Sequence, residues 1–452
     1  MGNVFLGIDL GTSSVKMVLV KDGRVVQKST APCDSQDPEG WIRSIRDALK
    51  QISGRSRITA AGLSSQTGTY IVNEKYILPW SGKEGQEELK EIRERFTKRI
   101  FCEEIGMNHP SLTSYPLPKL LYSQRNIGSL SSFCQPKDLL YEYLTGSRVS
   151  DPYTWRGLAS IETGTYSSLL LDALGIPKEI LPPLVRPWDC AGVVSSQTAR
   201  KTGLPEGIPV YAGINDYYAA LLGMGVSIPG DWFDITGTSE HIGRIENRML
   251  PDTGLVSGPY LEGNVHYGVT ASTGAALSFG KKVFGPEPLW EDLTEEWIKK
   301  APVFRPYLKG RRSPEADPLA TGSFIGIRAG CTSAHMAYAV LEGVVFSLYH
   351  IYETIVREAG EMQSSGGIRV CGGASVNPLL NHLKAELFGQ ELWMMEEKDA
   401  SAFGAALCAM IGEGALAGPE EASSICRVSK VIRPEGALGS LLEERYQMYL
   451  EK

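Results

Sequence analysis

The chain has 452 residues, more than a single hydrophobic core normally supports, so we expect two or three domains. It carries 45 Lys and Arg against 52 Asp and Glu, a net charge of −7, and is 42% hydrophobic and 21% charged. These values are typical of a soluble globular protein. Because no block of like charge occurs, we do not expect nucleic acid or an anionic membrane to be the main partner.

The eight cysteines are dispersed and form no C-x-x-C pair. This favours reduced thiols over a disulfide framework or a zinc site. No basic segment followed by an apolar run precedes the first strand, so we expect no signal peptide. Apolar stretches such as Ala402–Ile411 are too short to span a bilayer. We therefore expect a cytoplasmic protein.

The first half of the chain shows strand-like runs followed by a mostly helical middle. The expected strands and helices are Val4–Leu10, Val15–Val20, Val25–Ser29, the helix Trp41–Ile52, a strand–loop–strand segment Ile58–Val72, the helix Pro136–Thr145, the strand Val210–Ala212 and the helix Ala219–Gly225. Asp-Gly within Lys21–Arg24 predicts a hairpin turn. This mixture indicates an α/β fold.

After Pro229-Gly230 the opening pattern returns. Phe233-Asp234-Ile235 leads into T-G-T-S as Ile8-Asp9-Leu10 leads into G-T-S-S. This internal repeat predicts two related α/β domains. The later expected elements are a long helix Ser333–Ala359, a strand Ile368–Cys371, helices Pro378–Phe388 and Ala402–Ile411, and an amphipathic helix Ala437–Leu450.

Two common nucleotide motifs, G-x-x-x-x-G-K-[ST] and G-x-G-x-x-G after a strand, are absent from the sequence. The turns Gly11-Thr12-Ser13 and Gly237-Thr238-Ser239 offer backbone N–H groups for phosphate instead. Taken singly, each turn is better explained by hairpin geometry. As a pair in separate domains they indicate a phosphate site.

Asp216 follows a strand and opens a small-residue helix. Asn215 or Asp216 is explained equally well as a helix N-cap or, for Asp216, as a proton acceptor near phosphate. The segment Gly372-Gly373-Ala374 with Asn377 predicts either a tight strand–helix connection or a flat surface on which a planar base lies.

Several segments in order resemble the FGGY carbohydrate kinases, of the actin/hexokinase-like superfamily, and the xylulokinase-like branch in particular. G-I-D-L-G-T-S-S-V-K resembles the first phosphate motif, D-I-T-G-T-S the second, Y-A-G-I-N-D-Y-Y the segment with the catalytic aspartate and C-G-G-A-S-V-N-P the adenosine motif. Tyr115–Tyr122 and Gly322–Gly343 resemble the two family signatures, and Arg305–Pro314 a preceding loop.

The resemblance implies two ribonuclease-H-like (actin-like ATPase) domains with a cleft between them, and ATP with Mg²⁺ as cofactors. Asp216 is implied as the general base and Asp9 as the metal-side carboxylate. The implied ATP-binding residues are Gly11, Thr12, Ser13, Lys16, Gly237, Thr238, Ser239, Gly274, Gly372, Gly373, Ala374 and Asn377. The implied substrate-binding residues are Gln66, Thr67, Trp80, Trp155, Arg156, Asn215 and Asp216.

The sugar site departs from better-known members. This chain has Ser65-Gln66-Thr67-Gly68 where xylulokinase-like chains have Gln-Met-His-Gly. The segment Trp80–Glu84 lacks the aspartate and arginine that family members usually have there. Arg156 is explained either by a substrate carboxylate or phosphate or by a surface acid. A ketopentose is the expected substrate; sedoheptulose, gluconate, erythritol and glycerol stay open. A non-catalytic sugar or nucleotide sensor is an alternative, and a chaperone- or actin-type ATPase is disfavoured.

We expect an N-terminal domain over 1–227, a C-terminal domain over 228–432, and a terminal helix over 433–452 that packs back on the N-terminal domain. The expected partner is a small sugar or polyol, with no nucleic acid or membrane; a homodimer stays open.

Overall fold

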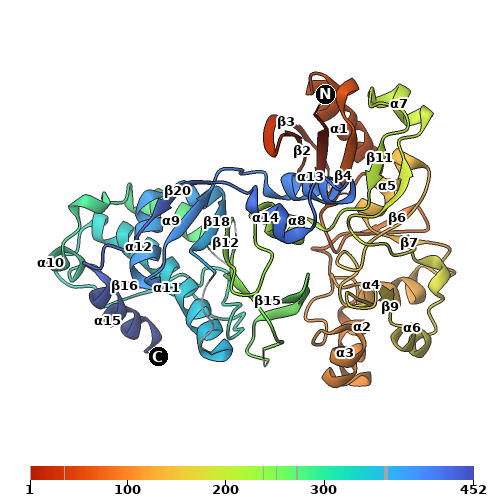
Figure 1. Cartoon of the computed structure of the whole chain (residues 1–452). Coiled ribbons are helices and arrows are strands. Elements are labelled where there is room, and N and C mark those ends of the chain that lie inside the picture. Colours follow the sequence, from red (N-terminus) through yellow and green to blue (C-terminus); the bar gives the residue numbers. More distant parts are fainter. Residues whose placement is uncertain are drawn as a thin grey trace. The chain divides into compact units, whose positions relative to one another are not determined.

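The computed structural model describes residues 2–34, 36–237, 239–250, 252–270, 273–360 and 365–451. It divides into two compact units. Unit 1 comprises Met1–Ser227 with Asp399–Cys426, and unit 2 comprises Ile228–Lys398 with Arg427–Lys452. The chain therefore returns to unit 1 near its end, which differs from the expected continuous C-terminal domain. In Figure 1 this returning blue segment, with α13, lies among the red and orange elements of unit 1.

Unit 1 is built on a mixed sheet in the order β10-β11-β4-β1-β2-β3. Its central strand β1 pairs antiparallel with β2 and parallel with β4. The strands are β1 (Val4–Leu10), β2 (Ser14–Lys21), β3 (Arg24–Pro32), β4 (Ala60–Ser65), β10 (Cys190–Val193) and β11 (Pro209–Tyr211). Six of the seven β1 residues are buried, and β4 is buried throughout, so β1 and β4 form the centre of the sheet.

Helices flank this sheet and build a second, smaller core beside it. The helices of unit 1 are α1 (Pro38–Gln51), α2 (Gln86–Arg95), α3 (Lys98–Ile105), α4 (Pro116–Asn126), α5 (Pro136–Thr145), α6 (Ser168–Leu174), α7 (Ser196–Thr202), α8 (Asp216–Gly223), α13 (Ala400–Gly412) and α14 (Pro419–Ser424). Short strands β5 (Tyr70–Val72), β6 (Tyr76–Leu78) and β7 (Phe133–Cys134) form one small sheet, and β8 (Ala159–Ser160) and β9 (Thr165–Tyr166) another.

Unit 2 repeats the same sheet plan. Its sheet runs β14-β15-β13-β12-β18-β19-β20, and β12 pairs antiparallel with β13 and parallel with β18, as β1 does with β2 and β4. The strands are β12 (Trp232–Thr236), β13 (Glu240–Glu246), β14 (Val256–Tyr260), β15 (Gly263–Thr270), β18 (Ile368–Gly372), β19 (Leu392–Met395) and β20 (Val428–Ile432). The predicted internal repeat is confirmed by this matching strand order.

The helices of unit 2 are α9 (Thr273–Phe284), α10 (Glu295–Ile298), α11 (Ser333–Ala359), α12 (Pro378–Phe388) and α15 (Gly439–Leu450), with a small sheet of β16 (Val303–Arg305) and β17 (Ser323–Ile325). Leu441, Leu442 and Tyr446 of α15 belong to the core of unit 2. The terminal helix therefore packs on unit 2, against α11, α12 and β16, and not on the N-terminal domain as expected.

Helix α11 is the one helix in the described part of the chain that is long and apolar enough to cross a membrane. Within its most apolar window, 72% is buried inside the structure. That burial accounts for its composition as the core helix of unit 2.

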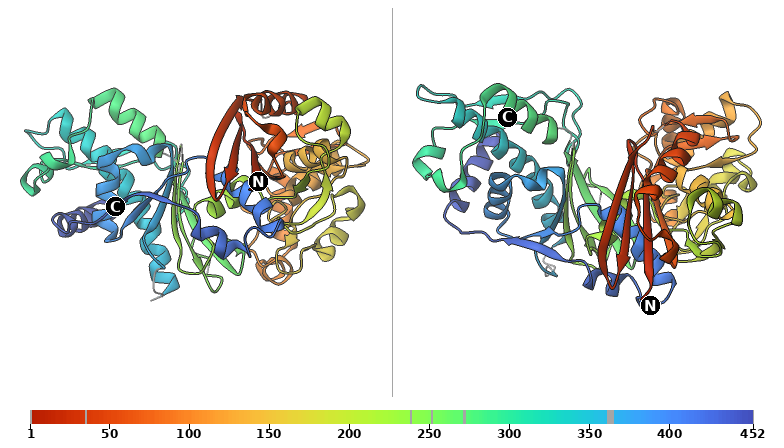
Figure 2. Two further views of the ribbon diagram at one scale, coloured as in Figure 1. Left: turned by 45° about the horizontal axis from the view of Figure 1, so that its top comes forward. Right: turned by 90° about the horizontal axis from the view of Figure 1, so that it is seen from above.

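Helix α13 approaches the backbone of unit 1 unusually closely. A Cβ placed on Gly7 of β1 would lie 1.9 Å from Ala402 O, and a Cβ on Gly62 of β4 would lie 1.9 Å from Ala405 O. A Cβ on Gly404 of α13 would lie 1.9 Å from Ala219 O of α8. Glycine is therefore required at these positions, and α13 holds β1, β4 and α8 together. Figure 2 shows the blue segment beside the red strands in two further views.

Gly404→Ala tests this packing. Since the added methyl group meets backbone rather than a movable side chain, we expect the free energy of unfolding to fall by about 1–3 kcal/mol, despite the better helix propensity of alanine. Chemical denaturation measures the change. Gly418→Ala is the control, because nothing lies within 4 Å of its added Cβ; equal stability of the two variants would contradict the close-packing account.

Candidate active site

Asp9 stands near the end of the central strand β1. It lies opposite Lys16 of β2 and Ser64 of β4, and is 8% exposed. Burial raises the pKa of its carboxyl to about 6, while the Ser64 side chain and Lys16 lower it and Asp399 raises it. Its Oδ1 is buried and has no hydrogen-bond partner among the described residues. An acceptor atom in this state suits a ligand that supplies positive charge.

The turn after Asp9 is a narrow backbone loop. Gly11 N donates to Ser14 O at 3.0 Å, and Cys33 N donates to Ser13 O at 3.0 Å. Thr12 and Ser13 are exposed at its tip. Lys16, predicted to bind ATP, forms an ion pair of 3.1 Å with Asp399. The turn is accessible, whereas the charge of Lys16 is already matched.

Asp216 is the first residue of α8. The N-cap is Asn215, whose side chain accepts from Tyr218 N at 3.1 Å and donates from Nδ2 to Tyr153 O at 2.8 Å. Oδ1 of Asp216 accepts from Tyr217 N at 2.8 Å. Because Asn215 supplies the cap, the Asp216 carboxylate is not required for capping.

Asp9 and Asp216 influence each other electrostatically. The pKa of Asp216 is raised to about 7. Burial is the main cause and the negative charge of Asp9 the second, while hydrogen bonds from the backbone of Tyr217 and Asp216 lower the pKa. A carboxylate with a pKa near neutrality is suited to accept a proton in catalysis. Two neighbouring carboxylates with raised pKa values are typical of a functional site.

A buried network supports the loop that carries Asp216. Lys137 Nζ on α5 lies 2.9 Å from Asp151 Oδ2 and donates to Ala212 O at 2.9 Å. Asp151 accepts from the backbone N–H groups of Tyr153 and Thr154 at 2.9 and 3.0 Å. Sequence reasoning did not identify this network, because Lys137 and Asp151 are 14 positions apart and each stands among other polar residues.

The predicted sugar residues Gln66 and Thr67 follow β4 directly. Gln66 is 2% exposed, and neither Oε1 nor Nε2 has a hydrogen-bond partner among the described residues. Thr67 Oγ1 donates to Gln135 Oε1 at 3.3 Å, and Gly68 N donates to the same atom at 3.0 Å. A buried amide without partners is costly, so Gln66 is the position where a polar ligand would gain most.

The aromatic and cationic side chains predicted to bind the sugar differ in their exposure. Trp80 is 47% exposed, in keeping with a binding role. Trp155 is fully buried in the small core with Phe133 and Tyr166, and this differs from the expectation that it binds substrate. Its large apolar ring stabilises the fold more when buried in that core than it would in a solvated site. Arg156 is partly exposed, with its guanidinium carbon 5.7 Å from the Tyr115 ring centre and 5.5 Å from that of Tyr218.

In unit 2 the second turn joins β12 to β13. Gly237 and Ser239 are half-buried, and Ser239 Oγ lies 3.4 Å from His241 Nε2. Thr238, also predicted to bind ATP, lies outside the described residues. Gly274 is the second residue of α9.

The glycine segment at the end of β18 makes the predicted strand–helix connection. Gly372 has φ 105°, and a Cβ there would lie 2.0 Å from Thr236 O, so glycine is required. Gly373 is exposed and Ala374 half-buried. Asn377 is the N-cap of α12, accepts from Leu380 N at 2.9 Å, and donates to Glu287 Oε1 at 2.8 Å.

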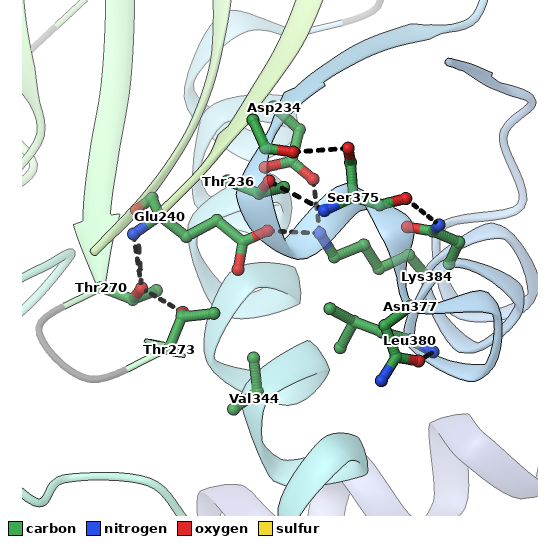
Figure 3. A network of polar contacts seen from close by, with 12 residues as sticks. Asp234, Thr236, Glu240, Thr270, Thr273, Val344, Ser375, Asn377, Leu380 and Lys384 are labelled. Carbon is green, nitrogen blue, oxygen red and sulfur yellow. Dashed lines mark hydrogen bonds and ion pairs between the residues drawn. The ribbon is translucent and has the colours of Figure 1, made fainter. Parts of the chain in front are cut away.

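A group that sequence reasoning missed lies beneath these loops. Lys384 of α12 contacts both Asp234 of β12 and Glu240 of β13 (Figure 3). Charged residues inside the apolar runs W-F-D-I-T and H-L-K-A-E-L were the available signal.

No group of three or more His, Cys, Asp or Glu side chains within the described ranges is placed to hold a metal ion by itself. A metal at Asp9 would therefore need ligands from a bound nucleotide or water, as Mg²⁺ commonly has.

Comparison with known proteins identifies the family. The N-terminal domain of the FGGY family of carbohydrate kinases matches residues 4–223, and its C-terminal domain matches residues 235–413. A xylulose kinase of Bacillus subtilis is 28% identical over 92% of this chain and 89% of its own length. A glycerol kinase of Thermus brockianus is 28% identical over 91% of this chain and 90% of its own.

Solved structures agree on the fold. A xylulose kinase from Brucella ovis is similar with a TM-score of 0.85 at 26% identity, covering 99% of this chain and 98% of that one. A gluconate kinase from Lactobacillus acidophilus has a TM-score of 0.85 at 21% identity, covering 100% and 97%. The two units are thus actin-like ATPase domains, and the chain belongs to the FGGY family of carbohydrate kinases, phosphotransferases that use ATP to phosphorylate a sugar hydroxyl.

Proposed function

We propose that this kinase phosphorylates a ketopentose, xylulose or ribulose, with Asp216 as the general base. The observation that carries the proposal is the Asp216 carboxylate, which is held at the start of α8 by a hydrogen bond from Tyr217 N and has a pKa of about 7. The names of the similar xylulose kinases support the choice of sugar. We further propose a cytoplasmic location, consistent with eight free cysteines.

In the proposed reaction a sugar hydroxyl gives its proton to Asp216 Oδ2 as its oxygen attacks the γ-phosphorus of ATP. The bond from that phosphorus to the β–γ bridging oxygen breaks, and ADP leaves. The proton on Asp216 is then lost to solvent, which restores the base. Asn215 and the Lys137–Asp151 pair keep the carboxylate in place through the loop they bind.

The nucleotide is proposed to bind through the backbone of several loops rather than through a lysine. The proposed contacts are Gly11, Thr12 and Ser13 in unit 1 and Gly237, Thr238, Ser239, Gly274, Gly372, Gly373, Ala374 and Asn377 in unit 2. Lys16 is proposed to act at longer range, since it pairs with Asp399. Mg²⁺ fits at Asp9, whose buried Oδ1 has no protein partner in the described chain, and would supply charge neutralisation of the phosphates.

Arg156 favours a second candidate, an aldonate such as gluconate. Its guanidinium is set beside the rings of Tyr115 and Tyr218, and Tyr218 lies in the helix that begins with Asp216. A cation at that position would pair with a sugar carboxylate, which a ketopentose lacks. Gln66, with its buried amide, suits either substrate because an amide both donates and accepts.

Asp216→Asn tests the base. We expect kcat to fall by about 10²–10⁴-fold, the usual contribution of general base catalysis, with ATP affinity little changed. A coupled assay of ADP release and calorimetry of ATP binding measure the two quantities. Asp172→Asn, at an exposed position on α6, is the control. Turnover of Asp216→Asn close to that of the wild type would remove Asp216 as the base.

The pH profile gives an independent check on the same residue. A carboxyl whose pKa is raised to about 7 is protonated, and inactive as a base, below that pH. We therefore expect kcat/KM for the sugar to rise with pH through about 7 and to level off above it. A profile that is flat between pH 5.5 and 8 would contradict a base with this pKa.

A panel of ketoses, aldonates and polyols, measured by ADP release with the wild type and Arg156→Gln, decides the substrate class. If the substrate is a ketopentose, the substitution should change KM little. Selective loss of aldonate turnover in Arg156→Gln would favour the second candidate instead. If no compound stimulated ADP release, the kinase proposal would give way to a sugar or nucleotide sensor.

A further inference from the structure

The fully buried group of Asp234, Glu240 and Lys384, here called the charged triad, has no counterpart among the predicted site residues. Lys384 Nζ lies 2.6 Å from Asp234 Oδ2 and also contacts Glu240 Oε1. The three side chains are at most 1% exposed. Figure 3 shows them meeting from β12, β13 and α12.

Burying the charged triad carries a large desolvation penalty. One ammonium group faces two carboxyl groups, and burial together with the Asp234 charge raises the pKa of Glu240 to about 8, while Lys384 lowers it. Apolar residues of the same size would generally stabilise such a site at least as well. The cost is therefore best explained by what the triad holds in place.

Two members of the triad flank the second phosphate turn. Asp234 lies two residues before Thr236, where β12 ends, and Glu240 is the first residue of β13. Contacts to one lysine therefore hold both ends of the segment that contains Gly237 and Ser239. The backbone N–H of Glu240 also donates to Thr270 Oγ1 at 3.2 Å.

The same hydrogen bonds continue to the start of α9. Thr270 Oγ1 lies 2.7 Å from Thr273 Oγ1, and Thr273 precedes Gly274. This links the Glu240 end of the turn to a second segment proposed to bind ATP.

The segment Gly372–Asn377, proposed to bind the adenosine of ATP, is also hydrogen-bonded to residues close to the triad. Thr236 Oγ1 accepts from Ser375 N at 3.0 Å and donates to Cys371 O at 3.1 Å. Asn381, one turn before Lys384 on α12, donates to Ser375 O at 2.8 Å. Three loops that are separate in the sequence thus share one buried support.

We propose that Asp234, Glu240 and Lys384 are positioning residues that set the three nucleotide loops of unit 2 relative to one another. The inference rests on the proposed assignment of these loops to ATP. None of the three contacts the nucleotide, because all are buried; they act through Thr236, Thr270 and Ser375. Their effect is expected on ATP binding and not on the sugar.

The test is a neutral triple variant, Lys384→Met with Asp234→Leu and Glu240→Met, which replaces the three ionisable groups by apolar side chains of similar size. We expect the denaturation midpoint to stay near that of the wild type, and the Kd for ATP, measured by calorimetry without sugar, to rise by at least about tenfold. In the kinase assay KM for ATP should rise in parallel, with KM for sugar unchanged.

The matched control is another buried ion pair of unit 2. Arg445 of α15 binds Glu342 of α11 at 2.6 Å, and neither side chain exceeds 5% exposure. Arg445→Met with Glu342→Gln should change stability without changing the Kd for ATP. An unchanged Kd for ATP in the folded triple variant, or an equal rise in the control, would overturn the positioning role.

If the triple variant does not fold, Thr236→Val takes its place, since it cuts the hydrogen bond to Ser375 N and leaves the triad intact. The same rise in the Kd for ATP is expected, and no rise overturns the inference. Wild-type protein that binds ATP but phosphorylates no sugar would contradict the proposed function alone, because the ATP-binding comparison stays valid.

Discussion

The contact on which unit 1 depends is the approach of α13 to β1, β4 and α8 at glycine. Gly7, Gly62 and Gly404 permit backbone atoms to meet where any side chain would collide. Asp9 stands two residues after Gly7 on β1, and Asp216 opens the helix that Gly404 contacts. Burial is the main cause of the raised pKa of Asp216 and the charge of Asp9 adds to it, so both depend on how closely α13 packs against β1 and α8. Because α13 comes from residues 400–412, unit 1 is complete only after the chain has passed through unit 2.

Both units support the loops of the candidate site with buried lysines. In unit 1, Lys137 joins Asp151 to the carbonyl of Ala212 and so steadies the loop before Asp216. In unit 2, Lys384 joins the two strands on either side of the phosphate turn. Each lysine lies on a helix that stands, in chain order, between two strands that pair in parallel. Lys137 is on α5, between β4 and β11, and Lys384 is on α12, between β18 and β19. The two halves of the repeat thus use similar charge chemistry on a similar frame, with different residues.

Local patterns in the sequence were enough for much of the fold. Val4–Leu10 is the strand that its apolar run predicts, and Asp22 and Gly23 have the positive φ values of the hairpin that Asp-Gly predicts. Ser333–Ala359 and Pro378–Phe388 are the helices expected from their periodicity. The burial of Trp155 could not be predicted from its local sequence for a physical reason: it depends on distant residues such as Phe133 and Tyr166.

By itself the sequence determined the class of fold, the repeat, the family resemblance and the candidate residues Asp9 and Asp216, because each is written in a short segment. Only the tertiary structure decided that α13 returns to unit 1, that the terminal helix packs on unit 2, that Asn215 is the cap in place of Asp216, and that Lys384 lies between two carboxylates. These facts join residues far apart in the chain. Backbone proximity and burial set them, and neither has a local signature in the sequence.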